Sequence, residues 1–376
     1  MDYIYGQLMR CSRLFSIALL SLSFILLSAC SQNRQSGDNT VSVNLLKVEE
    51  PSWKDFFREI EVIPLENRDS AYLNNSCGFT YSKVEDKFYI MDMANKSIII
   101  FNADGEWLET FNRYGRGPEE YVMLTDMVYN EELRSLDVLD ASGTIISYDL
   151  NPPHRMIRRI KIPTVRATHY LFPDGSGYYL LSQFEDHALN YLDAETGELT
   201  TVTGAPEVGR AVRAGYHASR SPFYRLSGQV YYVDGASGAV FRLEGNRAVP
   251  CRSWDFGRYT FNLDKVPGGE SDRPYEQVEM SSSSMAGPFV NTQETARFVF
   301  AQVLFMKRDL NVVLDKEIGR VSVFTKWKEG PFFFPGLFLE DALYVLCPPE
   351  HADKLLPLNN PVYSEDSNFL IVKYLL

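Results

Sequence analysis

One unit of short apolar segments recurs along most of this chain and constrains its fold more than any other feature. In the clearest copy an aromatic segment, Lys87–Asp92, is followed by a polar turn and an aliphatic segment, Ile98–Phe101. A turn containing Gly105 then leads into a third segment, Trp107–Phe111. Short aromatic and β-branched runs between Asp, Asn and Gly turns are typical of β-strands. Further copies are Ser135–Ile162, Gly177–Thr203, Gln229–Trp254, Phe298–Phe324 and Ala342–Leu376.

The copies follow one another at about 40–50 residues where no insertion intervenes, which is the period of four-stranded propeller blades. A β-sandwich with coincidental spacing is the alternative. The repeated order of strand types favours an all-β, six-bladed β-propeller with four-stranded antiparallel blades over residues 58–376. We expect Arg58–Leu65 to pair beside Phe369–Leu375, because closing the ring removes the edges that an open sheet would expose. Trp53–Ile60 is expected to form a turn or two of helix.

The N-terminus has the pattern of an export signal. Leu14–Leu27 is an apolar run too short to span a bilayer comfortably, and Arg10 and Arg13 precede it. The run ends in Leu27-Ser28-Ala29-Cys30, which is typical of a bacterial lipobox, whose cysteine is lipidated and becomes the new N-terminus. We therefore expect a lipoprotein signal peptide at 1–29 and a lipidated N-terminus and flexible tether at 30–57. An ordinary signal peptide, or an N-terminal anchor with a coincidental cysteine, is the alternative.

Charge and cysteine content narrow the possible partners. The net charge is −12, and removal of residues 1–29 takes away two arginines and one aspartate, which leaves −13. This negative net charge argues against nucleic acid as a partner, since binding to nucleic acid rests on neutralising phosphates with Lys and Arg.

Besides Cys30, the mature chain holds Cys77, Cys251 and Cys347, with no C-x-x-C pair. We expect three buried thiols rather than a zinc site or a disulfide scaffold, although one pair could bridge.

The repeat, with Val62-Ile63-Pro64-Leu65-Glu66 before it and Gly115-Arg116-Gly117-Pro118-Glu119-Glu120-Tyr121 after its first copy, resembles a known family. This is the lipid-anchored, six-bladed β-propeller family of Bacteroidetes, which is related in architecture to NHL-repeat propellers. The resemblance covers about residues 58–376 and implies a fold and a cell-envelope location, but no reaction. Residues Ser31–Gln35 lack the acidic run associated with surface export in this phylum. We therefore expect the periplasmic leaflet of the outer membrane rather than the cell surface.

The register of the repeat indicates which loops share a face. In a propeller, loops joining second to third strands lie on the same face as loops joining an outermost strand to the next innermost strand. Segments 115–121, 165–169, 205–221, 258–295 and 347–368 then share one face, and they include both of the longest insertions. Long loops on a rigid scaffold are where binding usually occurs. The candidate binding residues on this face are Arg116, Glu119, Glu120, Tyr121, Arg166, His169, Arg210, Arg213, His217 and Arg220.

Two interpretations stay open for the charged candidates. Arg116 can clamp a carboxylate or sulfate of a ligand, or it can pair with Glu119 or Glu120 to brace the turn between two blades. The basic residues at 210–220 can form an anion-binding rim, joined by Arg166 and His169. Alternatively, they form a solvated loop that pairs with neighbouring acids.

Other chemistry is not indicated by the sequence. The histidines lack the spacing of a zinc motif and no G-x-S-x-G elbow is present, so we assign no catalytic residue, metal or cofactor. Asp92, Asp140 and Asp234 recur at equivalent strand ends, where turn capping explains them better than catalysis. We expect an envelope-tethered binding or scaffold lipoprotein that holds a glycan, peptide or protein partner. A lyase or hydrolase acting on a glycan or peptide at the channel mouth is the alternative.

Overall fold

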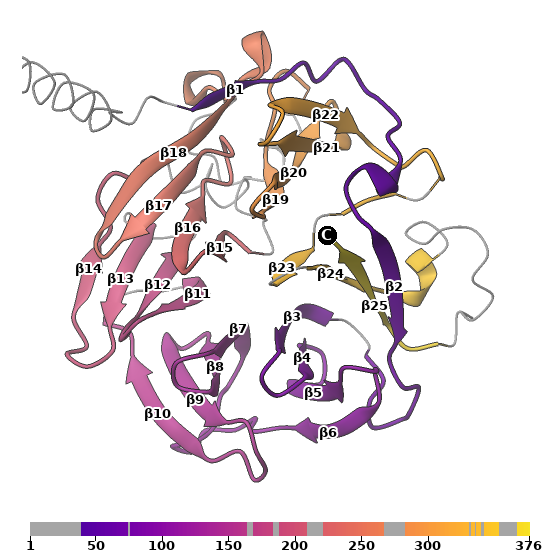
Figure 1. The fold of residues 1–376 in the computed structure, drawn as a ribbon. Coiled ribbons are helices and arrows are strands. Elements are labelled where there is room, and N and C mark those ends of the chain that lie inside the picture. The colour runs from indigo at the N-terminus through magenta and orange to yellow at the C-terminus, as the bar shows by residue number, and fades with distance from the viewer. Residues whose placement is uncertain are drawn as a thin grey trace, which may run out of the picture. The chain divides into compact units, whose positions relative to one another are not determined.

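Six β-sheets stand around a common centre in the computed structural model (Figure 1). The structure describes residues 39–73, 76–163, 168–182, 188–208, 221–266, 283–330, 332–334, 336–339, 342–352 and 367–376. Thr40–Leu376 form one unit. Each sheet is a blade of four antiparallel strands, and one blade carries an additional parallel strand. The expected six-bladed β-propeller is therefore confirmed.

The first three blades are built from consecutive strands, the first innermost and the last outermost (Figure 1). Blade 1 contains β3 (Ser76–Ser82), β4 (Lys87–Asp92), β5 (Ser97–Asn102) and β6 (Trp107–Phe111). Blade 2 contains β7 (Leu124–Asn130), β8 (Ser135–Asp140), β9 (Thr144–Asp149) and β10 (Met156–Lys161). Blade 3 contains β11 (Thr168–Asp174), β12 (Gly177–Ser182), β13 (Leu189–Asp193) and β14 (Leu199–Thr201).

The remaining blades follow the same order, except that blade 6 takes its outermost strand from the start of the chain. Blade 4 contains β15 (Phe223–Leu226), β16 (Gln229–Val233), β17 (Val240–Glu244) and β18 (Arg247–Asp255), with β1 (Thr40–Ser42) outside β18. Blade 5 contains β19 (Phe289–Glu294), β20 (Phe298–Phe305), β21 (Arg308–Asp315) and β22 (Arg320–Phe324). Blade 6 contains β23 (Leu337–Leu339), β24 (Ala342–Cys347), β25 (Leu370–Leu375) and β2 (Glu59–Pro64).

Burial explains why some strands have continuous apolar sequences and others alternate. Every residue of β8 and β12 is buried, because neighbouring blades cover both faces of these middle strands. The outer strands β6 and β10 alternate between half-buried and exposed residues over most of their length. This period of two is expected where one face of a strand meets solvent. The middle strands thus supply most of the packing between blades.

The two ends of the propeller sequence meet in blade 6. β2 pairs antiparallel with β25 along all six residues, from Glu59 opposite Leu375 to Pro64 opposite Leu370. On its other edge β25 pairs with β24. The expected pairing of Arg58–Leu65 with Phe369–Leu375 is therefore confirmed, and it closes the ring.

The segment before β2 packs along the outside of three blades, and we call residues 40–58 the strap. β1 runs parallel to β18 on blade 4, and the N–H of Glu49 donates to the carbonyl of Val323 on blade 5 (2.7 Å). Phe57 is 2% exposed in the aromatic cluster between blades 5 and 6. The packed unit thus starts at Thr40, whereas the sequence pattern predicts a tether over residues 30–57. The strap's buried apolar residues, such as Val43 and Leu45, stand singly among polar ones, so the sequence resembles a linker.

The strand bounds correct two expectations, the length of one insertion and the extent of a helical turn. The insertion expected at 258–295 is shorter, because Phe289–Glu294 form β19, the innermost strand of blade 5. The helical turn expected at Trp53–Ile60 is limited to a 3₁₀ turn, η1 (Trp53–Asp55), which the Ser52 side chain caps. From Glu59 onward the chain pairs with β25 instead.

Removal of Phe369–Leu376 is expected to abolish cooperative folding. The deletion removes β25, so β24 and β2 each lose a partner and the ring opens. Circular dichroism melting and sedimentation should show an unfolded or aggregated chain. Removal of Leu376 alone, which follows the last strand pair, is the control and should leave a cooperative transition. A protein lacking Phe369–Leu376 that melts like the wild type would contradict ring closure.

Candidate functional site

The two faces of the propeller differ in the length of their connections. On one face, which we call the loop face, long segments leave the strand ends at 112–123, 202–222, 256–288, 325–336 and 348–369. On the opposite face the strands are joined by short turns, such as those at 83–86, 131–134 and 227–228. The strand order thus places the longest connections on one face of the propeller, as the repeat predicted.

The loop between blades 1 and 2 holds four of the candidate residues. Glu120 folds back so that its carboxylate accepts the N–H of Gly117 (2.6 Å). A Cβ at Gly115 would lie 1.9 Å from Oε2 of Glu120, so a larger residue there would displace this carboxylate. Glu120 therefore braces the loop, but through the backbone and not through Arg116 as one interpretation proposed. Arg116 and Glu119 are exposed on the loop face.

Tyr121 is a structural residue rather than an accessible binding residue. Its side chain is 0% exposed, its hydroxyl donates to the carbonyl of Lys96 (2.9 Å), and it accepts the N–H of Arg113 (3.2 Å). The hydroxyl of Tyr148 in blade 2 donates to the carbonyl of Glu119 (2.7 Å). These bonds fix the loop between the two blades, which is why a tyrosine follows the two glutamates.

The other candidates are not brought together by the described residues. His169 lies inside β11, half-buried at a register shift near the start of this innermost strand, and not in a loop. Arg166, Arg210, Arg213, His217 and Arg220 lie outside the residues that the structure describes. The basic rim therefore stays a prediction.

The recurring aspartates cap turns, as expected. Oδ1 of Asp92 accepts the N–H groups of Ala94 (3.0 Å) and Asn95 (3.1 Å). Oδ1 of Asp140 accepts from Val122 and Met123, which ties the loop after β6 to the end of β8. Asp234 likewise accepts the N–H of Ser237. All three carboxylates thus organise the loop face.

The cysteines and acids of the described residues form no metal site. Cys347 is a buried free thiol, and burial raises its pKa to about 12. Cys251 is also a free thiol, but it is half-buried and not buried as expected. The side chain of Cys77 is not among those that the structure describes. Within the described ranges no group of three His, Cys, Asp or Glu side chains could hold a metal ion.

Hydrogen bonds between the innermost strands of neighbouring blades were not predicted from the sequence. In three of the blade pairs, a side chain on one innermost strand accepts a backbone N–H from the next innermost strand. The partners are separated by 45 or 49 residues, close to one repeat, and a polar residue inside the first strand of these three blades is the signal. The pairs are Thr80 with Tyr129 (3.4 Å), Asp126 with Leu171 (2.9 Å) and Gln293 with Phe338 (3.1 Å).

Asp126 is the acid among these three side chains, and its pKa is unusual. Burial disfavours its charged form and raises the pKa to about 7, although the N–H groups of Leu171 and Met127 both donate to the carboxylate and lower it. A carboxyl group poised near neutral pH is typical of functional sites, but it also occurs in structural networks. Here both oxygens accept backbone bonds, which indicates a structural role between blades 2 and 3.

A second buried carboxylate is fully ion-paired. Burial alone would raise the pKa of Glu294, but bonds from Arg252, Lys316 and the Tyr224 hydroxyl hold it below its ordinary value. Arg252 donates to both oxygens at 2.8 Å. Because each oxygen already has charged partners, this cluster joins blades 4 and 5 and is not poised to bind a ligand.

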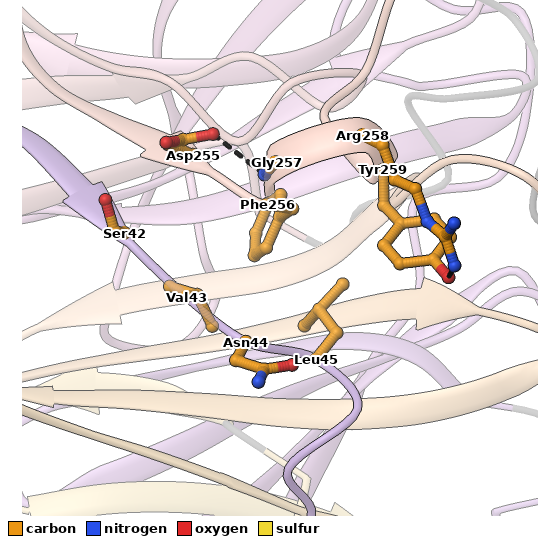
Figure 2. A pocket seen from close by; sticks show the side chains of 9 residues that line it. All are labelled: Ser42, Val43, Asn44, Leu45, Asp255, Phe256, Gly257, Arg258 and Tyr259. Carbon is orange, nitrogen blue, oxygen red and sulfur yellow. Dashed lines mark hydrogen bonds between the residues drawn. The ribbon is translucent and has the colours of Figure 1, made fainter.

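Two hollows are present on the described surface. A groove of about 440 Å³ runs between the strap and the start of the segment that follows β18 (Figure 2). Val43, Leu45 and Phe256 supply its apolar side chains, and Arg258 and Tyr259 lie at one end. A smaller hollow of about 240 Å³ lies near the C-terminal ends of β3, β7 and β23. There the rings of Tyr81 and Tyr344 stack with centroids 5.4 Å apart.

The chain belongs to the family described as a domain of unknown function, DUF4934, whose model matches residues 40–373. The match begins at the first residue of the strap, which agrees with the packing of β1. No curated protein matches the chain. Among the described residues, no helix has the length and apolar character needed to cross a membrane.

Solved structures that share the fold include two from Bacteroides species. One is described as an exported protein from Bacteroides fragilis NCTC 9343; it is 15% identical, with a TM-score of 0.70, and the match covers 90% of this chain and 100% of that one. The other is a member of the DUF4221 family from Bacteroides vulgatus ATCC 8482. It is 12% identical, with a TM-score of 0.54, and the match covers 85% of this chain and 97% of that one. At these identities the likeness shows the fold alone.

The variant Asp126→Asn tests the titration of Asp126. Because the folded-state pKa lies above the unfolded value of about 3.9, the carboxyl group keeps a proton that the unfolded chain releases. Its contribution to stability is complete below the unfolded pKa and is lost as pH rises through about 7. Asparagine does not titrate, so the melting temperature of the variant relative to wild type should be higher at pH 8 than at pH 5.

Asp193→Asn is the matched control for this measurement. The N–H and side chain of Thr196 lower the pKa of Asp193, so this carboxyl is ionised in both states between pH 5 and 8. Its variant should differ from wild type by the same amount at both pH values. An Asp126→Asn variant with no such pH dependence would show that Asp126 is charged in the folded protein throughout this range.

Proposed function

We propose that this protein is an exported lipoprotein, anchored through lipid on Cys30, that binds a partner on the loop face of its propeller. The partner is a glycan, a peptide or another envelope protein. The anchor is supported by the apolar run and lipobox at Leu14–Cys30, and the structural neighbour from Bacteroides fragilis is described as exported. We place the protein at the outer membrane, with the periplasmic leaflet preferred.

The difference between the two faces is the observation that supports binding most. Closure through β2 and β25 makes a rigid ring, and the innermost strands are tied to one another by side chains. The long connections at 202–222, 256–288 and 348–369 all leave from one face of this scaffold. Long loops held by a scaffold with short turns elsewhere are typical of a binding face.

The enzyme alternative would rest on Asp126, whose pKa of about 7 suits a general acid or base. Both of its oxygens accept backbone N–H groups, from Met127 and Leu171, so a substrate would have to compete with these bonds. We therefore favour binding over a lyase or hydrolase activity.

Acylation of Cys30 can be measured directly. Cells expressing the full chain are grown with a clickable fatty acid, and labelling of the wild type is compared with that of Cys30→Ser. The wild type should be labelled and found in the membrane fraction, because the thioether-linked lipid requires this sulfur. Equal labelling of the two proteins would contradict the anchor.

The loop face is tested by partner capture from native membranes. Replacing Arg116, Arg210 and Arg213 with Ala should weaken capture of the partner about tenfold or more, since each arginine can pair with an anionic group. Mass spectrometry of proteins and glycans co-purified with the tethered protein gives the readout. The melting temperature of the variant should stay close to wild type, because Arg116 is exposed and charges in long loops contribute little to folding.

The matched control changes an arginine on the opposite face. Arg155 is exposed at one of its short turns, so replacing it with Ala removes positive charge without touching the loop face. This variant should capture the partner as the wild type does. Equal capture by the wild type, the loop-face variant and the control variant would show that the arginines of the loop face do not bind the partner.

A further inference from the structure

We propose that the outer rim of blades 4 and 5, at the beginning of the strap, is the surface that lies against the lipid membrane. The rim surface consists of Asn44–Val48 on the strap and 257–259 after β18. This inference rests on the proposed lipid anchor at Cys30, and it adds an orientation that the anchor alone does not give.

The covalent reach of the anchor restricts which part of the propeller can approach the bilayer. Thr40 is fixed on the outer edge of blade 4, since β1 pairs with β18. A chain rises at most about 3.3–3.6 Å per residue, so the ten steps from Cys30 to Thr40 span at most about 35 Å. The rim beside β1 is therefore held near the lipid, whereas blade 1 lies on the other side of the ring (Figure 1).

The strap carries exposed apolar side chains at this place. Leu46 is 58% exposed and Val48 is 48% exposed, and the exposed Lys47 lies between them. The N–H of Leu46 is bonded to the Asn44 side chain (3.1 Å) and that of Glu49 to Val323, so the short run is held in place from both sides. Apolar residues beside a basic one suit the boundary between acyl chains and headgroups.

The groove beside the run extends the same surface. Its apolar side chains, Val43, Leu45 and Phe256, come from the strap and from the residue after β18 (Figure 2). They are 3–7% exposed and form the packed floor of the groove. The guanidinium of Arg258 lies 4.7 Å from the Tyr259 ring centre, and Arg258 is exposed. An exposed guanidinium beside the groove can pair with a lipid phosphate.

The charges of the rim permit contact with anionic lipid although the mature chain carries −13. Glu49 lies 3.5 Å from Lys47 and 3.1 Å from Arg320, and Glu50 lies 3.6 Å from Lys326. The carboxylate of Asp255 accepts the N–H of Gly257 (2.8 Å). These acids of the strap and groove thus have positive or donor partners, which reduces repulsion from lipid phosphates.

Site-specific fluorescence on the full, lipidated protein tests this orientation. Leu46→Cys is labelled with an environment-sensitive fluorophore and placed in vesicles of phosphatidylethanolamine and phosphatidylglycerol, with and without brominated acyl chains. The matched control is Leu108→Cys on β6 of blade 1, a leucine that is 40% exposed on the far side of the ring. Wild type treated with the same reagent corrects for label on native cysteines.

We expect the label at Leu46 to shift to shorter wavelength in vesicles and to be quenched at least twofold by brominated lipid, while the label at Leu108 stays unchanged. Equal behaviour of the two labels would overturn the inference. A blue shift at Leu46 without lipid quenching would overturn it as well, because a second protein copy would then cover the rim. Loss of vesicle binding in wild type and in Cys30→Ser alike would instead contradict the proposed anchor.

Discussion

The antiparallel pairing of β2 with β25 is the constraint on which the rest of this structure depends. It joins a strand from the start of the propeller to the last strand of the chain, so six blades become a ring with no open end. Each blade can then bury both faces of its middle strands against two neighbours, as the fully buried β8 and β12 show. Without closure, the first and last blades would each expose an apolar face.

The strap extends this closure over blades 4 and 5 before β2 completes blade 6. Phe57 brings it into the aromatic cluster, where its ring lies 5.4 Å from that of Phe300 and 5.0 Å from that of Tyr374. The same segment connects the propeller to the proposed lipid anchor. One short stretch of chain therefore stabilises the ring and determines which rim approaches the membrane, while the loop face carries the long connections.

The sequence predicted the middle strands almost residue by residue, and the physical reason is their burial. Lys87–Asp92, Gly177–Ser182 and Leu189–Asp193 match β4, β12 and β13 because both faces of these strands are covered and their apolar runs stand out between turns. The innermost strands were not recognised within the repeat. Strands such as β7 mix polar and apolar residues, since a side chain there bonds to the innermost strand of the next blade, as Asp126 does to Leu171.

The candidate site was predictable only in part. Strand order assigns loops to faces, and Asp92 and Asp140 cap turns as their positions indicated. Tyr121 was misassigned, because sequence alone does not show that its ring is buried between two blades. The strap was mistaken for a tether for a related reason: Val43 and Leu45 bury only against distant strands.

Native-state hydrogen exchange of the full chain, followed by mass spectrometry, tests the central claim that closure through blade 6 holds the whole ring. Amides of β2 and β25 should exchange with the same opening free energy as those of β4 and β8, because loss of the closing pair unfolds every blade. Exchange of β2 and β25 at a much lower free energy, with β4 and β8 still protected, would contradict the account.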